Sequence, residues 1–162
     1  MTPPIIIDIE ASGFGTGSYP IEIGYILASG NTWCSLIKPE QDWLHWDTSA
    51  QQVHNISREL LLEHGKNASL IAQQLNDGLL NQTVYSDSWV HDYIWMGRLF
   101  DAAETTPHFK FKDIRLILNS QQEAAWHTTK NQVVDELGQQ RHRASIDAKV
   151  LQMTWLRTLE LS

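Results

Sequence analysis

Short apolar runs separated by turn residues occupy the first quarter of the chain. A β-branched run at 5–7 ends at Asp8, and two further apolar runs cover 21–28 and 32–37. Runs of this length that end at polar or turn residues are typical of β-strands. A Ser-Gly-Asn turn at 29–31 joins the second and third runs, so we predict an antiparallel hairpin there and a meander of three strands overall.

Helical spacing replaces strand spacing after the third run. Leucines and isoleucines recur at helical intervals over 47–80, with Ser57 placed as an N-cap. A short strand is expected at 84–86, followed by a helix that opens at Ser88. The expected apolar stripe of this helix consists of Trp89, Tyr93, Met96 and Phe100.

The last third of the chain predicts one strand and two helices. Pro107 interrupts the chain before a strand at 109–111, and helices are expected at 121–137 and 145–159. The order βββ, α, β, α, β, α, α predicts an α/β fold with a mixed five-stranded sheet and helices on both faces. A length of 162 residues without a Pro/Gly-rich linker indicates a single domain over 1–162.

Charge and composition narrow the function classes. Lys and Arg total 12 and Asp and Glu total 19, which gives a net charge of −7. Proteins that coat long duplex nucleic acid are normally basic, so we expect any contact with nucleic acid to be local and to depend on metal. The single cysteine, Cys34, excludes an internal disulfide and a zinc site built from cysteines. No apolar stretch reaches the roughly 20 residues that span a bilayer, so we expect no membrane partner and a cytoplasmic protein.

Two carboxylates, Asp8 and Glu10, flank Ile9 at the end of the first predicted strand. Side chains two residues apart point to the same face of a strand, and adjacent carboxylates repel each other and resist burial. One of them lying in solvent at the strand end would remove this conflict. The apolar run before them favours the other interpretation, a divalent cation, because hard cations such as Mg²⁺ bind oxygen ligands.

Two more acids and one histidine extend this candidate site. Asp147 lies in the last predicted helix beside Val150 and Leu151, and a carboxylate on an apolar face needs a partner. Asp92 is placed similarly in the helix after the fourth strand, and His142 precedes Asp147 near the start of its helix. Four acids and one imidazole are the side chains of a two-metal hydrolase.

Two segments resemble the motifs of one enzyme family. Residues 8–14, Asp-Ile-Glu-Ala-Ser-Gly-Phe, resemble the first motif of the DEDD exonucleases, the superfamily of RNase T and the polymerase III proofreading subunit, which usually reads Asp-x-Glu-Thr-Thr-Gly. Residues 142–148, His-Arg-Ala-Ser-Ile-Asp-Ala, resemble the third motif, His-x-Ala-x-x-Asp, whose histidine marks the "h" subgroup. Residues 21–24 resemble the second strand of the family, and 53–56 resemble its Val-His-Gly-Ile segment. The resemblance covers nearly the whole chain in the right order.

The second motif departs from the family pattern. The family often shows His-Asn-x-x-Phe-Asp, whereas 87–92 reads Asp-Ser-Trp-Val-His-Asp and keeps only the last residue. We therefore take Asp92 as the fourth acid and keep Asp87 as the alternative. Ala11 and Ser12 stand where the family has two threonines. We expect this change to be tolerated, because main-chain groups contact the substrate there in the family.

The resemblance implies a ribonuclease H-like fold and a metal-dependent 3′–5′ exonuclease that releases nucleoside monophosphates from a single-stranded DNA or RNA end. It implies two Mg²⁺ ions, for which Mn²⁺ should substitute, with Asp8 bridging them. Glu10 and Asp147 would complete the shell of one ion, and Asp92 would hold the other. His142 would be the general base. The implied substrate-binding residues are Ile9, Ala11, Ser12 and Phe14.

Two other functions fit the same residues. An oligoribonuclease-like activity on very short RNA agrees with the net charge of −7, because phosphate neutralisation dominates the binding of extended strands. A non-catalytic module that binds an end or a partner polymerase would keep only the fold. The sequence is also compatible with a homodimer.

Several nearby side chains have more than one interpretation. Phe14 either packs within its own loop or contacts the terminal base, and Arg141 and Arg143 either contact phosphate or lie in solvent. We expect His54 to pack or to orient the site. The histidines expected at the surface are His45, His64, His108 and His127.

Overall fold

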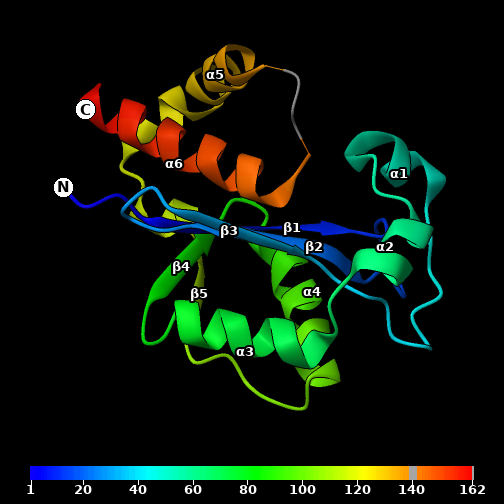
Figure 1. Ribbon diagram of the computed structural model, residues 1–162. Helices are drawn as coiled ribbons and strands as arrows, with labels where there is room; N and C mark the ends of the chain where they lie inside the picture. The colour runs from blue at the N-terminus through cyan, green and yellow to red at the C-terminus, as the bar shows by residue number, and fades with distance from the viewer. Residues whose placement is uncertain (139–141, 162) are drawn as a thin grey trace.

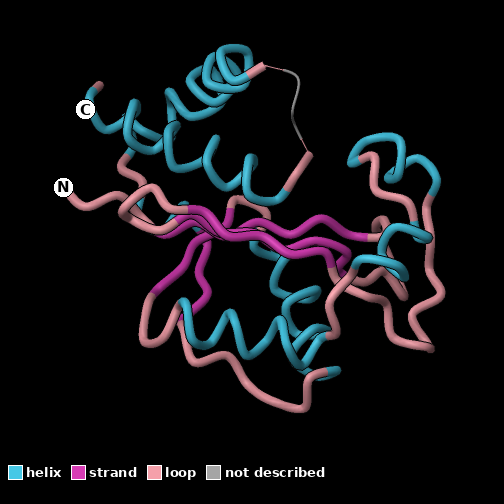
Figure 2. The backbone as a smooth tube through the Cα atoms, viewed as in Figure 1, coloured by secondary structure: helices cyan, strands magenta, loops and turns pink. Residues whose placement is uncertain are grey.

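A mixed five-stranded sheet forms the centre of the protein (Figures 1 and 2). The computed structural model describes residues 1–138 and 142–161. The strands are β1 (Ile5–Ala11), β2 (Pro20–Ile26), β3 (Thr32–Leu36), β4 (Thr83–Ser86) and β5 (Lys110–Asp113). Their order is β3-β2-β1-β4-β5, with an antiparallel β1–β2–β3 meander and with β4 and β5 parallel to β1. The expected α/β fold is confirmed.

Helices cover both faces of the sheet. They are α1 (Thr48–His54), α2 (Arg58–His64), α3 (Ala68–Gly78), α4 (Trp89–Ala102), the 3₁₀ helix η1 (Ile114–Ile117), α5 (Ser120–Leu137) and α6 (Ala144–Glu160). Figure 1 shows α3 and α4 on one face, α5 and α6 on the other, and α1 and α2 beyond the end of β1. Within the described part of the chain, no helix is long and apolar enough to cross a membrane.

Strand β1 lies in the middle of the sheet and is packed on both sides. Ile7 and Ile9 belong to the core beneath α3 and α4, whereas Ile6 packs with side chains of α5 and α6. Because side chains alternate along a strand, Asp8 and Glu10 share the face of Ile6 and point toward α6. The first strand is therefore central, and its two carboxylates face a layer of helices.

Three helices replace the single helical region expected after the third strand. Helix α1 ends at Asn55, whose left-handed backbone (φ 56°) stops the helix. Helix α2 follows Ser57, whose hydroxyl accepts the Leu60 N–H as an N-cap does, and it ends at Gly65. A Cβ at Gly65 would lie 2.4 Å from the Leu61 carbonyl oxygen, so glycine is required at this stop.

The buried face of α4 differs from the expected stripe. Tyr93 is 56% exposed, and Trp89 is half-buried, with its Nε1 donating to the Phe111 carbonyl. The buried residues are Asp92, Trp95, Met96, Leu99 and Phe100. The inward face thus includes a carboxylate, which hydropathy alone would place outside. The fifth strand also lies slightly later than expected, and η1 was not predicted.

Gly24 allows α6 to begin directly on the sheet. It lies opposite Asp8 in the β1–β2 pairing. A Cβ at this position would lie 2.6 Å from the Ser145 nitrogen and 2.9 Å from the Ala144 carbonyl carbon. Real Cβ atoms do not approach backbone so closely, so glycine here permits the contact between β2 and the first turn of α6.

We therefore expect Gly24→Ala to lower the free energy of unfolding by about 1–3 kcal/mol, the usual cost of overpacking. Urea denaturation followed by circular dichroism measures it. Gly97→Ala is the matched control, because a Cβ at Gly97 in α4 would meet nothing within 4 Å. The control should stabilise the protein by up to about 1 kcal/mol through helix propensity. Equal effects of the two variants would contradict the close approach.

Candidate metal centre

Four acidic side chains from three elements meet near the end of β1. Asp8 and Glu10 come from β1, Asp92 from the first turn of α4, and Asp147 from the first turn of α6. Asp8 lies among them, since the negative charges of the other three all raise its pKa. The structure thus brings together the four acids selected from the sequence.

Asp92 is deeply buried, and one carboxylate oxygen of the half-buried Asp8 is buried. Within the described residues, Asp8 Oδ2 is buried and has no hydrogen-bond partner. Asp92 is 1% exposed, and its Oδ2 accepts a hydrogen bond of 2.5 Å from the Ser86 hydroxyl at the end of β4. A buried, unpartnered carboxylate oxygen is costly in a folded protein and calls for a ligand.

Burial and mutual repulsion keep these acids from ionising easily. Burial raises the pKa of Asp8 well above its usual range, and the neighbouring carboxylates raise it further. Burial, then the charge of Asp147 and a hydrogen bond with it, raises the pKa of Glu10 to about 8. Burial raises the pKa of Asp92 to about 7, although the Ser86 hydrogen bond acts in the opposite direction. A bound cation would favour the ionised forms and displace these protons.

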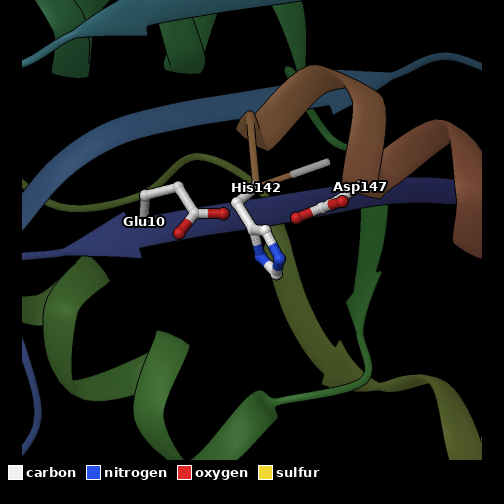
Figure 3. Close-up of side chains that lie close together, drawn as sticks. All are labelled: Glu10, His142 and Asp147. Carbon is white, nitrogen blue, oxygen red and sulfur yellow. The ribbon is translucent and has the colours of Figure 1, made fainter. Parts of the chain in front are cut away.

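His142 joins Glu10 and Asp147 on one side of the cluster. One ligand atom from each of the three lies within 4.8 Å of the other two, and Figure 3 shows the imidazole ring between the two carboxylates. His142 has a left-handed backbone (φ 66°), a conformation that is uncommon for residues other than glycine and in which asparagine, aspartate and histidine are enriched. It lies just before α6, at the point where the chain turns onto the sheet.

The donor set fits a divalent cation. It offers carboxylate oxygens, which Mg²⁺ and Mn²⁺ prefer, together with one imidazole nitrogen, which suits zinc and other transition metals. The unpartnered Asp8 oxygen and the raised pKa values of Asp8 and Glu10 show that these carboxylates need more positive charge than the described side chains supply.

An ion pair between a buried glutamate and a half-exposed arginine positions the start of α6. Glu22 on β2 is 1% exposed and accepts hydrogen bonds from Arg143 Nε (2.9 Å) and Nη2 (2.7 Å) and from the Ala144 backbone N–H (2.7 Å). Glu22 therefore caps α6 from a neighbouring strand, where Arg143 itself provides no side-chain cap. Because Glu22 lies opposite Glu10, this clamp holds His142 and the α6 carboxylate in register with β1.

Arg143, the arginine after His142, takes part in this clamp. The Arg143 guanidinium binds Glu22 although its side chain is 48% exposed, so simple solvation does not describe it. Arg141, the other arginine considered for phosphate, lies outside the described residues.

Asp87, the alternative fourth acid, lies at the edge of the cluster. Its Oδ2 is 2.5 Å from Lys130 Nζ of α5, and the two side chains are about equally exposed, at 21% and 29%. Asp87 is also the smallest of the charges that raise the pKa of Asp8. Asp92 is therefore the better-placed acid of the two.

A hollow of about 430 Å³ opens beside the carboxylates. Phe14, which is 69% exposed, meets the His91 ring at 5.1 Å between centroids, and His91 stacks on Trp95 at 5.7 Å. Ala50 and Val53 of α1 line the opposite side. The hollow therefore combines an acidic floor with an aromatic wall, which suits a flat ring attached to an anionic group.

The implied substrate-binding residues divide into two groups. Ile9, Ala11 and Phe14 line the hollow, whereas Ser12 does not. The Ser12 amide donates to the Tyr19 carbonyl, and its hydroxyl accepts the Tyr19 N–H. Ser12 therefore holds its loop closed instead of facing the hollow.

The histidines also differ in their surroundings. His45, expected at the surface, is half-buried, and its Nδ1 lies 2.9 Å from the Ser12 hydroxyl. His54 is 4% exposed and lines the hollow, and its Nδ1 accepts the Ile56 N–H. Burial lowers the pKa of His54, which favours the neutral ring. The three histidines that are exposed as expected are His64, His108 and His127.

Two wall residues, His91 and Trp95, were not selected from the sequence. Both follow from the choice of Asp92, since His91 adjoins it and Trp95 lies three residues further along the same helix. The sequence signal that could have identified them was an aromatic ring within one helical turn of the predicted ligand Asp92.

No protein-family model matches the sequence, and no curated protein matches it. Solved structures do match the fold. Escherichia coli exonuclease I in complex with a dA16 oligonucleotide gives a TM-score of 0.72 at 13% identity over 99% of this chain. The zinc-ion-bound form of the E. coli exonuclease I–ssDNA complex gives 0.71 at 13% identity, and exonuclease I from Methylocaldum szegediense gives 0.70 at 13% identity, each also over 99% of this chain. The chain spans only 41% of the length of each of these three proteins. At this identity the likeness establishes the ribonuclease H-like fold.

We expect the unfolding temperature of the protein in EDTA to fall as the pH rises from about 5 to about 8.5. The pKa values of Asp8, Glu10 and Asp92 are raised by folding, so their stabilising effect is present at low pH and is lost as the pH rises through about 7 and about 8. Differential scanning calorimetry measures this slope, and Mg²⁺ should reverse it at high pH.

Asp8→Asn should raise the unfolding temperature in EDTA and flatten the slope, because it removes the central charge. Asp42→Asn is the control, because Asp42 is exposed and lies outside the cluster. A wild-type unfolding temperature that climbs across this pH range would contradict the raised pKa values.

Proposed function

We propose that residues 1–162 form one nuclease domain, a divalent-metal-dependent 3′–5′ exonuclease that releases nucleoside monophosphates from single-stranded ends. The observation that carries this proposal is the convergence of four carboxylates and His142 from three elements beside an aromatic hollow. It is supported by the fold of exonuclease I, whose solved complexes hold single-stranded DNA oligonucleotides. The 3′–5′ polarity comes from the motif resemblance.

In this proposal the four carboxylates would hold two Mg²⁺ ions, and Asp8 is the central acid of the group. When bound, the cations lower the pKa of the attacking water and stabilise charge on the phosphate and the leaving oxygen. The terminal base would enter the hollow and pack against the ring cluster of Phe14, His91 and Trp95. Main-chain groups of Ile9 and Ala11 would meet its sugar. This arrangement would place the scissile phosphate over the acids.

His142 is the general base in this proposal. Its ring lies between Glu10 and Asp147, where a water attacking the phosphate would be held. A general base must be neutral before it acts. The carboxylates on both sides would then stabilise the positively charged imidazolium that forms when His142 takes the proton. The same position would also suit a metal ligand, so the two roles need an experiment that separates them.

Degradation of very short RNA is the second candidate function. The net charge of −7 favours it, since few cations are available to neutralise a long phosphate backbone. The third candidate is a non-catalytic end-binding module. Such a module would not require buried acids that repel one another, so the acid cluster disfavours it.

The direct test uses labelled single-stranded DNA and RNA oligomers with Mg²⁺, Mn²⁺ or EDTA, with products sized at single-nucleotide resolution. We expect mononucleotide release with either metal and none in EDTA or in Asp8→Ala. Asp92→Asn should lose far more activity than Asp87→Asn, because Asp92 is buried against Asp8 whereas Asp87 is paired with Lys130. Metal-independent release, or the reverse order of the two asparagine variants, would count against this assignment.

His142→Ala should lower the cleavage rate by roughly 10²- to 10⁴-fold, the usual value of general acid–base catalysis. The wild-type rate should fall at acid pH, because a protonated imidazole cannot take a proton from the attacking water. Mn²⁺ affinity measured by calorimetry should barely change in His142→Ala, since the four carboxylates remain. Loss of Mn²⁺ affinity together with activity would make His142 a ligand and require another base.

A further inference from the structure

Two more hollows continue from the acids on the side away from the aromatic wall. A middle hollow of about 200 Å³ is lined by Asp8, His142 and Asp147 on one side and by Lys130 of α5 on the other. An outer hollow of about 460 Å³ lies between η1 and α5 and shares Asp87 and Lys130 with the middle one. The middle hollow in turn shares Asp8, Ser88 and His142 with the aromatic hollow. The three hollows therefore follow one another, with the carboxylates between the first and the second.

Cationic side chains line the middle and outer hollows. Lys130 is partly buried, at 29% exposure, and its ammonium is 2.5 Å from Asp87. An ammonium has three N–H donors, so it can bind a phosphate oxygen while Asp87 orients it. The outer hollow adds Arg115, whose side chain is 68% exposed and has only a 3.4 Å contact with Asp113 among the described residues. Glu123 is the other acid of this hollow.

A strand bound at the acids has one continuous hollow path on the side opposite its terminal base. With that base against the aromatic wall and the scissile phosphate over the carboxylates, the rest of the strand must continue past them. The middle hollow is on that side, and Lys130 is the cation among the described residues that line it. Phosphate contacts by Lys and Arg position a strand without reading its sequence.

We propose that the outer hollow is the subsite for the nucleotides on the 5′ side of the scissile bond. Lys130 contacts the first phosphate upstream of the one that is cleaved, and Arg115 contacts the next. This proposal rests on the proposed function and extends it to substrate length. Among the described residues that line the two hollows, Lys130 and Arg115 are the cations, so we expect the gain in affinity with strand length to end after about two upstream phosphates.

Substrates with and without upstream phosphates test the subsite. Thymidine 5′-(p-nitrophenyl phosphate) has a phosphodiester to cleave but no upstream nucleotide, whereas oligomers of two to eight nucleotides add upstream phosphates one at a time. Lys130→Gln should raise KM for oligomers of three or more nucleotides by roughly 10-fold, the usual loss for a hydrogen bond to a charged group. Hydrolysis of the p-nitrophenyl ester should stay within about twofold of wild type, because the lost contact lies outside that substrate.

Two control variants test whether the effect is specific to Lys130. Lys66→Gln removes an exposed lysine that lines none of the three hollows, so KM should not change. Lys130→Arg keeps the charge and should recover most of the oligomer affinity. For Lys130→Gln and for Arg115→Gln, the slope of log kcat/KM against log salt should each become shallower by about 0.7, the value for one phosphate on a single strand.

The outcomes separate the subsite from the activity itself. An equal loss on the ester and on the oligomers would place Lys130 at the scissile phosphate and overturn the upstream assignment. Unchanged oligomer KM in both glutamine variants would overturn the subsite while leaving the exonuclease intact. If the wild type cleaves neither substrate, the proposed function fails. The subsite then stands only if fluorescence anisotropy shows a labelled pentanucleotide binding more weakly to Lys130→Gln than to wild type.

Discussion

Repulsion among buried carboxylates is the interaction on which this structure depends. Asp8 lies on the central strand with an unpartnered oxygen among the described residues, and its burial and the charges of four neighbouring acids raise its pKa. Such a cluster destabilises the folded chain once it ionises, and the same repulsion becomes affinity for a divalent cation. The fold therefore holds the carboxylates close together at the end of β1, where a bound cation would offset their repulsion. The surrounding strands and helices keep these side chains in place.

The position of α6 shows how this is done. Gly24 removes the side chain that would block the helix, and Glu22, two residues earlier on the same strand, binds both Arg143 and the first turn of α6. Glu22 is buried whereas Arg143 is 48% exposed, so removing the arginine would leave a buried carboxylate without its ion-pair partner. We infer that this pair is important for geometry, because it sets where His142 and Asp147 meet β1.

The surface around the acids divides by chemistry. Aromatic rings lie on one side of the carboxylates, and Lys130 and Arg115 lie on the other. A terminal nucleotide has a matching asymmetry, with a base at one end and a charged backbone at the other. In a chain of net charge −7, this separation would let an acidic protein hold a short anionic strand without a basic surface.

Local periodicity determined much of what could be read from the sequence. The three-strand meander, the Ser57 cap and the shared face of Asp8 and Glu10 follow from residue spacing along one segment, since the backbone sets periods of two and 3.6 wherever a strand or helix forms. The order of the motifs also indicated which acids would meet. Tertiary packing alone decided which side of α4 faces inward, which partner Arg143 takes and that Asp87 binds Lys130, 43 residues away. These contacts join elements far apart in the chain, and their geometry depends on how the helices settle on the sheet, which no local period encodes.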